Sequence, residues 1–300
     1  MLILTTAFIL TSLYYLGEKR LQEINQLKTI INSIRNNRYK SADEIKLSRR
    51  LIELEGDIKL MFMRTQNDIA NLKKLEQVRT EFLGNVSHEL RTPIFAIQGY
   101  LETLLNGALK DDQVNMNFLS KANHHTIRLN NLLNDLIDIS MIESGQMRMS
   151  FRYFGVKDFI ENMANEMRPL AENKGLELEI HPIRPKLELF GDKERLRQVV
   201  INLLSNAIKY TDQGKIEVIV EEKSKSGKIV VKDTGIGLSE EDMERVFERF
   251  YRVDKDRSKA AGGTGLGLAI VKHIIEAHNS HVKVESKPGE GSEFSFVLKK

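Results

Sequence analysis

A histidine followed by a carboxylate lies in the middle of a strongly helical stretch of the chain. His88 precedes Glu89 within residues 82–93, Phe-Leu-Gly-Asn-Val-Ser-His-Glu-Leu-Arg-Thr-Pro. Apolar residues recur around them at steps of three and four, the period of a helix that buries one face: Leu72, Leu75, Val78, Phe82, Val86, Leu90, Ile94, Ile97, Leu101 and Leu104. Because successive residues of a helix are about 100° apart, His88 lies opposite this stripe and is predicted to be exposed.

An exposed imidazole beside a carboxylate has the chemistry of a nucleophile. The neutral ring attacks through one nitrogen while the carboxylate of Glu89 holds and deprotonates the other. Thr92 follows His88 by four residues and is predicted on the same exposed face, one helical turn away. A surface histidine without a chemical role is the alternative that these residues alone leave open.

Three clusters in the second half of the chain provide groups that suit a bound nucleotide. They are Asp233-Thr234-Gly235-Ile236-Gly237, then Gly262-Gly263-Thr264-Gly265-Leu266-Gly267-Leu268, and the helical line Asn202, Asn206 and Lys209. Glycines ahead of a helix let backbone N–H groups approach phosphates. A carboxylate at a strand end can accept the adenine amino group, and amide and ammonium groups can hold Mg²⁺ and phosphate. No P-loop sequence is present, which excludes the P-loop enzymes.

The segment Ser87-His88-Glu89-Leu90-Arg91-Thr92-Pro93 resembles the phosphoacceptor box of bacterial two-component sensor histidine kinases. Downstream, residues 198–211 resemble the N box and residues 246–253 the F box of the same family, whose catalytic domain belongs to the wider GHKL ATPase group. The two glycine-rich clusters fit this domain in order and in rough spacing. The resemblance covers about residues 74–300.

The resemblance implies a role for each cluster. His88 accepts the phosphoryl group, and Glu89 orients and deprotonates the His88 imidazole. Thr92 belongs to an E-x-x-T phosphatase motif. Asn206 holds Mg²⁺, and a lid at residues 254–262 closes over ATP. The remaining ATP contacts are assigned to Asn202, Lys209, Tyr210, Asp233, Gly235, Gly237, Arg252, Gly263, Thr264, Gly265, Leu266 and Gly267, with Asp233 reading adenine, Tyr210 near the base and Arg252 reaching the γ-phosphate.

The N-terminal quarter is predicted to attach the protein to a membrane. Residues 1–17 are uncharged and mostly apolar, slightly fewer than the about 20 residues that a spanning helix needs. A basic n-region and a cleavage site are missing, which argues against a signal peptide, and uniform apolarity argues against an amphipathic helix. Basic residues then follow and indicate a cytoplasmic location for the rest of the chain: Lys19, Arg20, Lys28, Arg35 and Arg38.

The expected architecture is multidomain. A transmembrane anchor at 1–17 and a helical linker at 18–73 precede a helical hairpin at 74–145 and an α/β two-layer sandwich of the GHKL (Bergerat) ATPase fold at 146–300. Two helices separated near residues 36–41, with Ser41 or Asp43 as a cap of the second, resemble a HAMP-type linker; a plain signalling coiled coil is the equal alternative. The hairpin cannot bury both apolar stripes alone, which predicts a homodimeric four-helix bundle.

The amino-acid composition indicates a globular protein and excludes several other classes of function. Of 300 residues, 41% are hydrophobic and 29% charged, which is typical of globular domains. A net charge of +3 is too small to favour nucleic-acid binding. Cysteine is absent, which excludes disulfides, zinc thiolate sites and thiol catalysis.

The sequence thus predicts a single-pass, homodimeric sensor histidine kinase of the bacterial cytoplasmic membrane, with its catalytic part in the cytoplasm. It would autophosphorylate His88 with Mg-ATP, pass the phosphate to an aspartate on the receiver domain of a separate response regulator, and act as that regulator's phosphatase. Two alternatives are a GHKL ATPase without phosphotransfer and a degenerate dimeric signalling scaffold.

Overall fold

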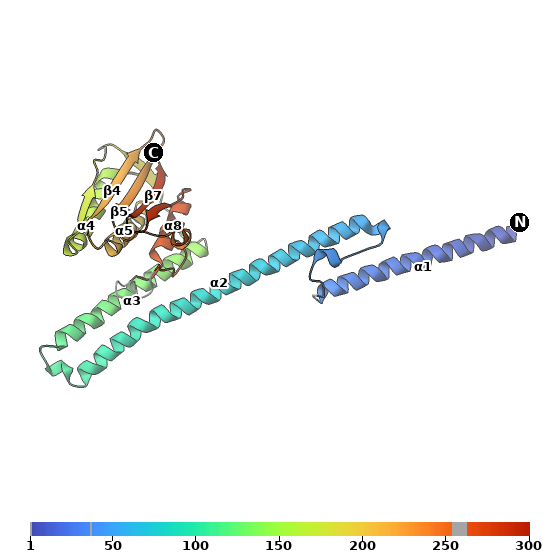
Figure 1. Cartoon of the computed structure of the whole chain (residues 1–300), viewed down its shortest axis with the longest axis horizontal. Coiled ribbons are helices and arrows are strands. Elements are labelled where there is room, and N and C mark those ends of the chain that lie inside the picture. Colours follow the sequence, from blue (N-terminus) through green and yellow to red (C-terminus); the bar gives the residue numbers. More distant parts are fainter. Residues whose placement is uncertain (1, 37, 254–262) are drawn as a thin grey trace. The chain divides into compact units, whose positions relative to one another are not determined.

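The computed structural model describes residues 2–36, 38–253 and 263–300 (Figure 1). These residues form two compact units, one ending at Glu81 and the other running from Phe82 to Lys300, and the boundary lies inside helix α2. The predicted ATP lid, residues 254–262, lies outside the described residues.

The first unit packs two helices through their connector. Helix α1 (Leu2–Arg35) is followed by the short 3-10 turns η1 (Ala42–Glu44) and η2 (Arg49–Leu51), and α2 (Ile52–Leu105) then begins. The core of this unit is centred on the connector residue Ile45, which is fully buried among Ile30 of α1 and Ile58 and Phe62 of α2. An apolar connector residue between two helices gives this short region a core of its own.

The predicted break between two helices is confirmed, but its details differ. Ser41 accepts a hydrogen bond from the Asp43 N–H at 3.2 Å and so caps the 3-10 turn η1, whereas the second helix begins only at Ile52. The helix expected to start at Lys74 is the C-terminal part of the 54-residue α2. Its apolar stripe continues without a capping residue or glycine turn at position 74, so nothing there ends the preceding helix.

The predicted membrane anchor is not supported by the structure. Residues 2–17 belong to the first half of α1, and their apolar run is followed at once by Glu18, Lys19 and Arg20. No helix within the described ranges is both long and apolar enough to cross a bilayer. The run is short of the about 20 residues required.

The second unit begins with the predicted hairpin. The C-terminal part of α2 leads through Gly107, which has a positive φ of 126°, and the 3-10 turn η3 (Ala108–Lys110) to α3 (Asn115–Glu143). Many apolar side chains of both helices remain exposed, among them Ile94, Leu101 and Ile137. The hairpin on its own therefore leaves an apolar surface uncovered.

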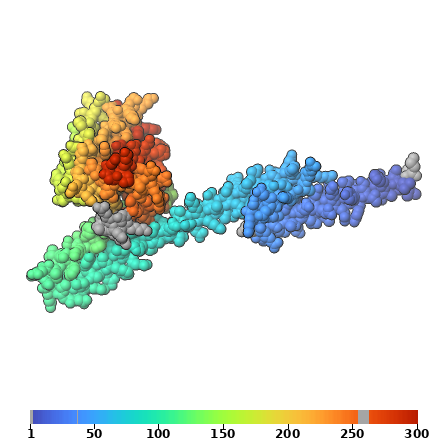
Figure 2. Space-filling view, viewed as in Figure 1, coloured from blue at the N-terminus to red at the C-terminus, as the bar shows by residue number. Residues whose placement is uncertain are grey.

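The rest of the second unit is a two-layer α/β sandwich, as predicted (Figure 1). Figure 2 shows the molecular surface of the same residues in a space-filling view. The mixed sheet has the order β1-β3-β7-β5-β4-β2, with β6 paired to β7; only β2 and β4 run parallel. The strands are β1 (Arg152–Gly155), β2 (Glu177–Ile180), β3 (Glu188–Gly191), β4 (Lys215–Glu222), β5 (Ser226–Asp233), β6 (Lys283–Lys287) and β7 (Gly291–Lys299). The helices are α4 (Val156–Asn173), α5 (Lys193–Tyr210), α6 (Glu240–Arg245) and α8 (Gly267–Ala277).

The core of the sandwich lies between the sheet and the helix layer. Helices α4 and α5 pack against the sheet and α8 packs against α5, with Phe159, Leu203 and Phe296 almost fully buried among them. Asp192 caps α5 by accepting the N–H groups of Glu194 and Arg195, each at 3.1 Å. This cap fixes the start of the helix that carries the predicted Asn202, Asn206 and Lys209 line.

Candidate nucleotide-binding and phosphoacceptor sites

A cavity of about 460 Å³ lies where α5, the turn after β5, the glycine-rich turn before α8 and the helix α3 meet. This volume is within the range of about 300–1,000 Å³ typical of small-molecule sites. Most of the predicted nucleotide residues line it: Asn202, Asn206, Lys209, Tyr210, Asp233, Gly237, Arg252, Gly263, Thr264, Gly265 and Gly267. Segments far apart in the sequence are thereby brought to one site.

Two of the predicted ATP contacts do not line the cavity. Gly235 lies behind Asp233, and a Cβ at this position would collide with the backbone oxygen of Tyr210, so its role is to allow this close approach. Leu266 is fully buried and immediately precedes α8, where it anchors the glycine-rich turn in the core. We therefore assign both residues a structural role in shaping the site, and their direct contact with ATP stays a prediction.

Asp233 provides the buried acidic group of the cavity. Its Oδ1 accepts the backbone N–H groups of Gly235 at 2.9 Å and Ser292 at 3.2 Å. Burial raises the pKa of this carboxyl, and the two hydrogen bonds oppose that shift. Since both bonds end on Oδ1, the second oxygen is available to an amino group of a ligand.

The ammonium group of Lys209 lines another part of the cavity. Burial, then the charges of Arg252 and Arg128, lower the pKa of Lys209 to about 8. A Cβ at Gly263 would collide with the Lys209 ammonium, so the glycine leaves room for this side chain. Within the described part of the chain no carboxylate forms an ion pair with Lys209. A half-buried ammonium among two arginines suits a polyanionic ligand such as a triphosphate.

The amide side chains of α5 fit the predicted metal site. Asn206 is half-buried and lines the cavity, and its side chain makes no hydrogen bond with another described residue. Asn202 donates from Nδ2 to the Gly267 carbonyl at 3.4 Å and so joins α5 to the start of α8. One protein oxygen matches the usual way in which Mg²⁺ is held, with substrate phosphates and waters completing its shell.

His88 is exposed, as the helical period predicts. Its side chain is 67% exposed, and its Nδ1 lies 3.9 Å from Oε1 of Glu89. The same carboxylate oxygen lies 3.9 Å from Nη1 of Arg252, which lines the nucleotide cavity. Glu89 is therefore adjacent both to the imidazole and to the cavity.

Thr92 is also exposed, on the turn after His88. Its hydroxyl donates to the His88 carbonyl at 3.3 Å. Ser87, Thr80 and Thr103 make the same contact with the residue four positions earlier, so this hydrogen bond is an ordinary helical one. An exposed hydroxyl can exchange this bond for one with water at little cost.

Three polar cavity residues on α3 were missed by the sequence analysis. Asn131, Asn134 and Asp135 line the cavity from α3. The hydroxyl of Thr264 donates to Oδ2 of Asp135 at 3.0 Å, and burial raises the pKa of this carboxyl to about 6. No local pattern marks these positions, because only the packing of α3 against the sandwich brings them to the cavity.

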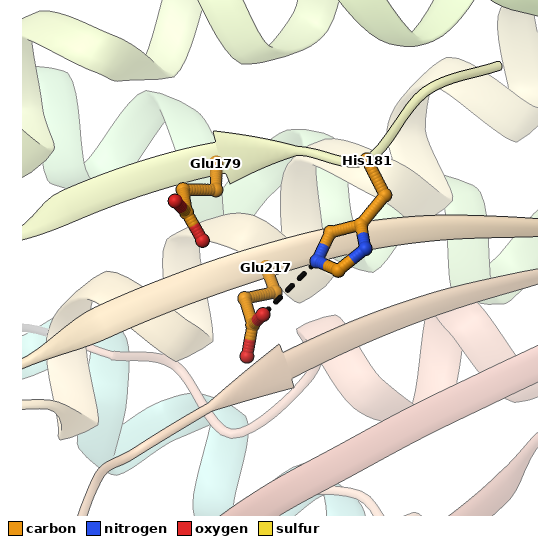
Figure 3. A group of neighbouring side chains, drawn as sticks. All are labelled: Glu179, His181 and Glu217. Atoms are coloured by element: carbon orange, nitrogen blue, oxygen red, sulfur yellow. Dashed lines mark hydrogen bonds and ion pairs between the residues drawn. The ribbon is translucent and has the colours of Figure 1, made fainter.

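A second polar cluster lies on strands β2 and β4, outside the cavity. Figure 3 shows Glu179, His181 and Glu217, with a 3.0 Å contact between His181 Nε2 and Glu217 Oε1. The ammonium of Lys215 lies 3.3 Å from Glu179 and 3.0 Å from Glu217. A cationic side chain thus already offsets these carboxylates, and we interpret the cluster as a cross-strand charge network.

Comparison with known proteins agrees with both sites. Residues 78–145 match the family of His Kinase A (phospho-acceptor) domains, and residues 191–300 match the histidine kinase-, DNA gyrase B- and HSP90-like ATPases. The phosphate regulon sensor protein PhoR of Pseudomonas aeruginosa is 37% identical over 237 residues, covering 79% of this chain and 53% of that protein. The chain thus spans about half the length of this relative.

Two solved structures are similar as well. The Acinetobacter baumannii histidine kinase AdeS superposes with a TM-score of 0.59 and 28% identity, covering 71% of this chain and 97% of that one. The full-length kinase ShkA, solved with AMPPNP, gives a TM-score of 0.55 and 27% identity, covering 74% of this chain and 45% of that one. Taken with the two family matches, these similarities show that the chain belongs to the two-component sensor histidine kinases.

Proposed function

We propose that this chain binds Mg-ATP in the cavity beside α5 and α8 and transfers the γ-phosphoryl group to His88. The observation that carries the proposal is the position of Arg252. This residue lines the nucleotide cavity and lies 3.9 Å from Glu89, which in turn lies 3.9 Å from the His88 imidazole. One arginine thus connects the place where a triphosphate would bind with the residue that would accept its phosphoryl group.

Different residues of the cavity would bind the adenine, the phosphates and the metal ion of Mg-ATP. Asp233 would accept the adenine amino group, and Lys209, Arg252 and the backbone of the glycine-rich turn would hold the phosphates. Asn206 would hold Mg²⁺, which offsets phosphate charge when bound. Thr264 and Gly265 shape the turn, since Gly265 has a positive φ of 73° and its carbonyl accepts the Phe250 N–H at 2.9 Å.

The transfer step assigns separate roles to the two nitrogens of His88. Glu89 lies near Nδ1, which leaves Nε2 as the attacking atom. A bond forms between Nε2 and the γ-phosphorus, and the bond from this phosphorus to the bridging oxygen of ADP breaks. Glu89 accepts the proton of Nδ1, so the ring does not accumulate positive charge.

We also propose that the active form is a homodimer. Ile94, Leu101 and Ile137 are 46%, 44% and 56% exposed on the two helices of the hairpin. A two-helix hairpin cannot cover such side chains, whereas a second copy completes a four-helix bundle. Sedimentation at several concentrations tests this, and Leu101→Glu is expected to yield monomers.

The partner that would take the phosphate is an aspartate on the receiver domain of a response regulator. His88 and Thr92 are both exposed, so a docked receiver domain can reach them. We propose that Thr92 orients a water molecule when the phosphorylated regulator is dephosphorylated, because an acyl phosphate needs no strong base for hydrolysis.

Labelling with γ-labelled Mg-ATP tests the proposed kinase activity. The purified chain should yield an acid-labile, base-stable phosphoprotein, as a phosphohistidine does. Hydrolysis of ATP without any labelled protein would instead favour a GHKL ATPase without phosphotransfer. Failure to bind ATP at all would favour a degenerate signalling scaffold.

A further inference from the structure

We propose that Asp135 of α3 gates the nucleotide cavity: in the docked arrangement its carboxylate lies at the phosphate end, and this carboxylate must leave that position before ATP binds there. The inference rests on the proposed ATP site and adds a regulatory element to it. The helix α3 belongs to the hairpin that carries the phosphoacceptor, so the gate would connect the two parts of the second unit.

The position of Asp135 is defined by its contact with the glycine-rich turn. Its Oδ2 accepts the Thr264 hydroxyl at 3.0 Å, and that hydroxyl oxygen accepts the Leu266 N–H at 3.3 Å. Gly263, the neighbour of Thr264, is the glycine that makes room for the Lys209 ammonium. The carboxylate therefore lies at the turn whose backbone N–H groups and nearby lysine would bind the triphosphate.

Charge makes this position incompatible with a bound triphosphate. Asp135 is partly buried, and burial together with the charge of Asp138 raises its pKa to about 6 while the Thr264 hydrogen bond opposes the shift. Its carboxyl is therefore ionised at neutral pH. A triphosphate arriving at Thr264 would bring further negative charge next to a carboxylate that is already poorly solvated.

Asp135 is held in place by the docking of the whole face of α3. Leu132 and Ile139 are buried in the core of the sandwich, on either side of Asp135. Asp138 accepts hydrogen bonds from Arg195 at 2.8 Å and Gln198 at 2.6 Å, both on α5. Because a helix moves as a rigid element, the carboxylate leaves the cavity only when these contacts loosen or its side chain turns away.

The consequence is a reciprocal coupling between nucleotide and hairpin. If docking of α3 lowers the affinity for ATP, then bound ATP must weaken the docking of α3 by the same factor. Any signal that shifts the hairpin would change the access of ATP to the cavity.

Calorimetric titration of the full chain with ATP, with and without Mg²⁺, tests the gate. Asp135→Asn keeps the shape but removes the charge, and we expect it to bind ATP about fivefold or more tightly in both conditions. Asp138→Asn lies outside the cavity yet weakens docking, so it should also bind ATP more tightly. Asp112→Asn, on the turn between the hairpin helices, carries the same charge change and should bind like the wild type.

Hydrogen exchange provides a second measurement that does not depend on the variants. Addition of AMPPNP should increase amide exchange along residues 132–139 of the wild-type chain, because bound nucleotide would release α3. Unchanged or greater protection there would contradict the gate.

The titration also separates this inference from the proposed function. Equal ATP affinity in the wild type and both α3 variants would contradict the gate while leaving the kinase proposal intact. Weaker binding by Asp135→Asn only with Mg²⁺ would contradict it too, because Asp135 would then act as a metal ligand. Absence of ATP binding in all four proteins would contradict both.

Discussion

The phosphoacceptor and the nucleotide cavity are built in different ways. His88, Glu89 and Thr92 lie within five consecutive residues of one helix, and their exposure follows from the period of that helix alone. The cavity combines α5, the turn after β5, the glycine-rich turn and α3, and its polar groups are partly buried. The first site therefore depends on local structure, whereas the second depends on the packed sandwich. Changes at the two sites should differ in what they affect: phosphoryl transfer or dephosphorylation at the helix, but binding of the nucleotide and its metal in the cavity.

The largest effect within the cavity is expected at Asn206. Asn206→Asp replaces a neutral metal ligand by an anion next to the phosphates, and autophosphorylation should fall by about 100-fold or more. The fold should persist, because the Asn206 side chain makes no hydrogen bond with another described residue. The initial rate of labelling and the melting temperature, measured together, check both expectations. Unimpaired labelling would mean that another residue holds the metal.

Asp233→Ala should weaken nucleotide binding directly. The carboxylate is buried and orders the turn after β5 through the Gly235 and Ser292 N–H groups, so two backbone donors lose their partner. We expect about a tenfold loss of ATP affinity and a stability loss of about 1–3 kcal/mol. Denaturant unfolding and ATP titration measure the two effects. Glu221→Gln, an exposed residue of β4, is the control for loss of a carboxylate and should alter neither.

The affinity for ATP should depend on pH through Lys209. Burial lowers the pKa of this lysine to about 8, so it is charged below that pH and neutral above it. Only the charged form attracts phosphates, and the ATP affinity should therefore fall as the pH rises through about 8. Lys209→Arg keeps the charge over this range and should flatten the profile. An equally steep decline in that variant would assign the pH dependence to another group.

Thr92→Ala should have the smallest effect on the chain itself. Among the described residues, its side chain hydrogen-bonds only to the exposed His88 carbonyl, so the melting temperature and the autophosphorylation rate should change little. The phosphorylated regulator should persist several-fold longer in the presence of the variant than with the wild type. Equal dephosphorylation by both proteins would leave Thr92 with a structural role only.

The difference between the phosphoacceptor and the nucleotide cavity also explains which features could be predicted from the sequence. The helical spacing of Asn202, Asn206 and Lys209 and the exposure of His88 follow from periodicity. These features depend on residues close together in the chain.

Features that depend on distant contacts were not predicted. Asp135 reaches the cavity only because Leu132 and Ile139 are buried against the sandwich. The short strand β3 has only four residues and is specified by its pairing with β1 and β7. Leu266 and Gly235 were assigned to the ligand through the resemblance to the family, whereas neither residue lines the cavity in the structure. The apolar run at residues 1–17 predicted a membrane anchor, and no helix among the described residues is long and apolar enough to span a membrane.

The most direct test of the central claim compares autophosphorylation and ATP binding in the wild type and His88→Gln. If the cavity binds ATP and His88 accepts its phosphoryl group, the variant should bind ATP with unchanged affinity and yet incorporate no acid-labile label. This outcome would show that ATP binding and phosphoryl acceptance belong to two different sites of the chain. Persistent labelling of His88→Gln at the wild-type rate would contradict the assignment of His88.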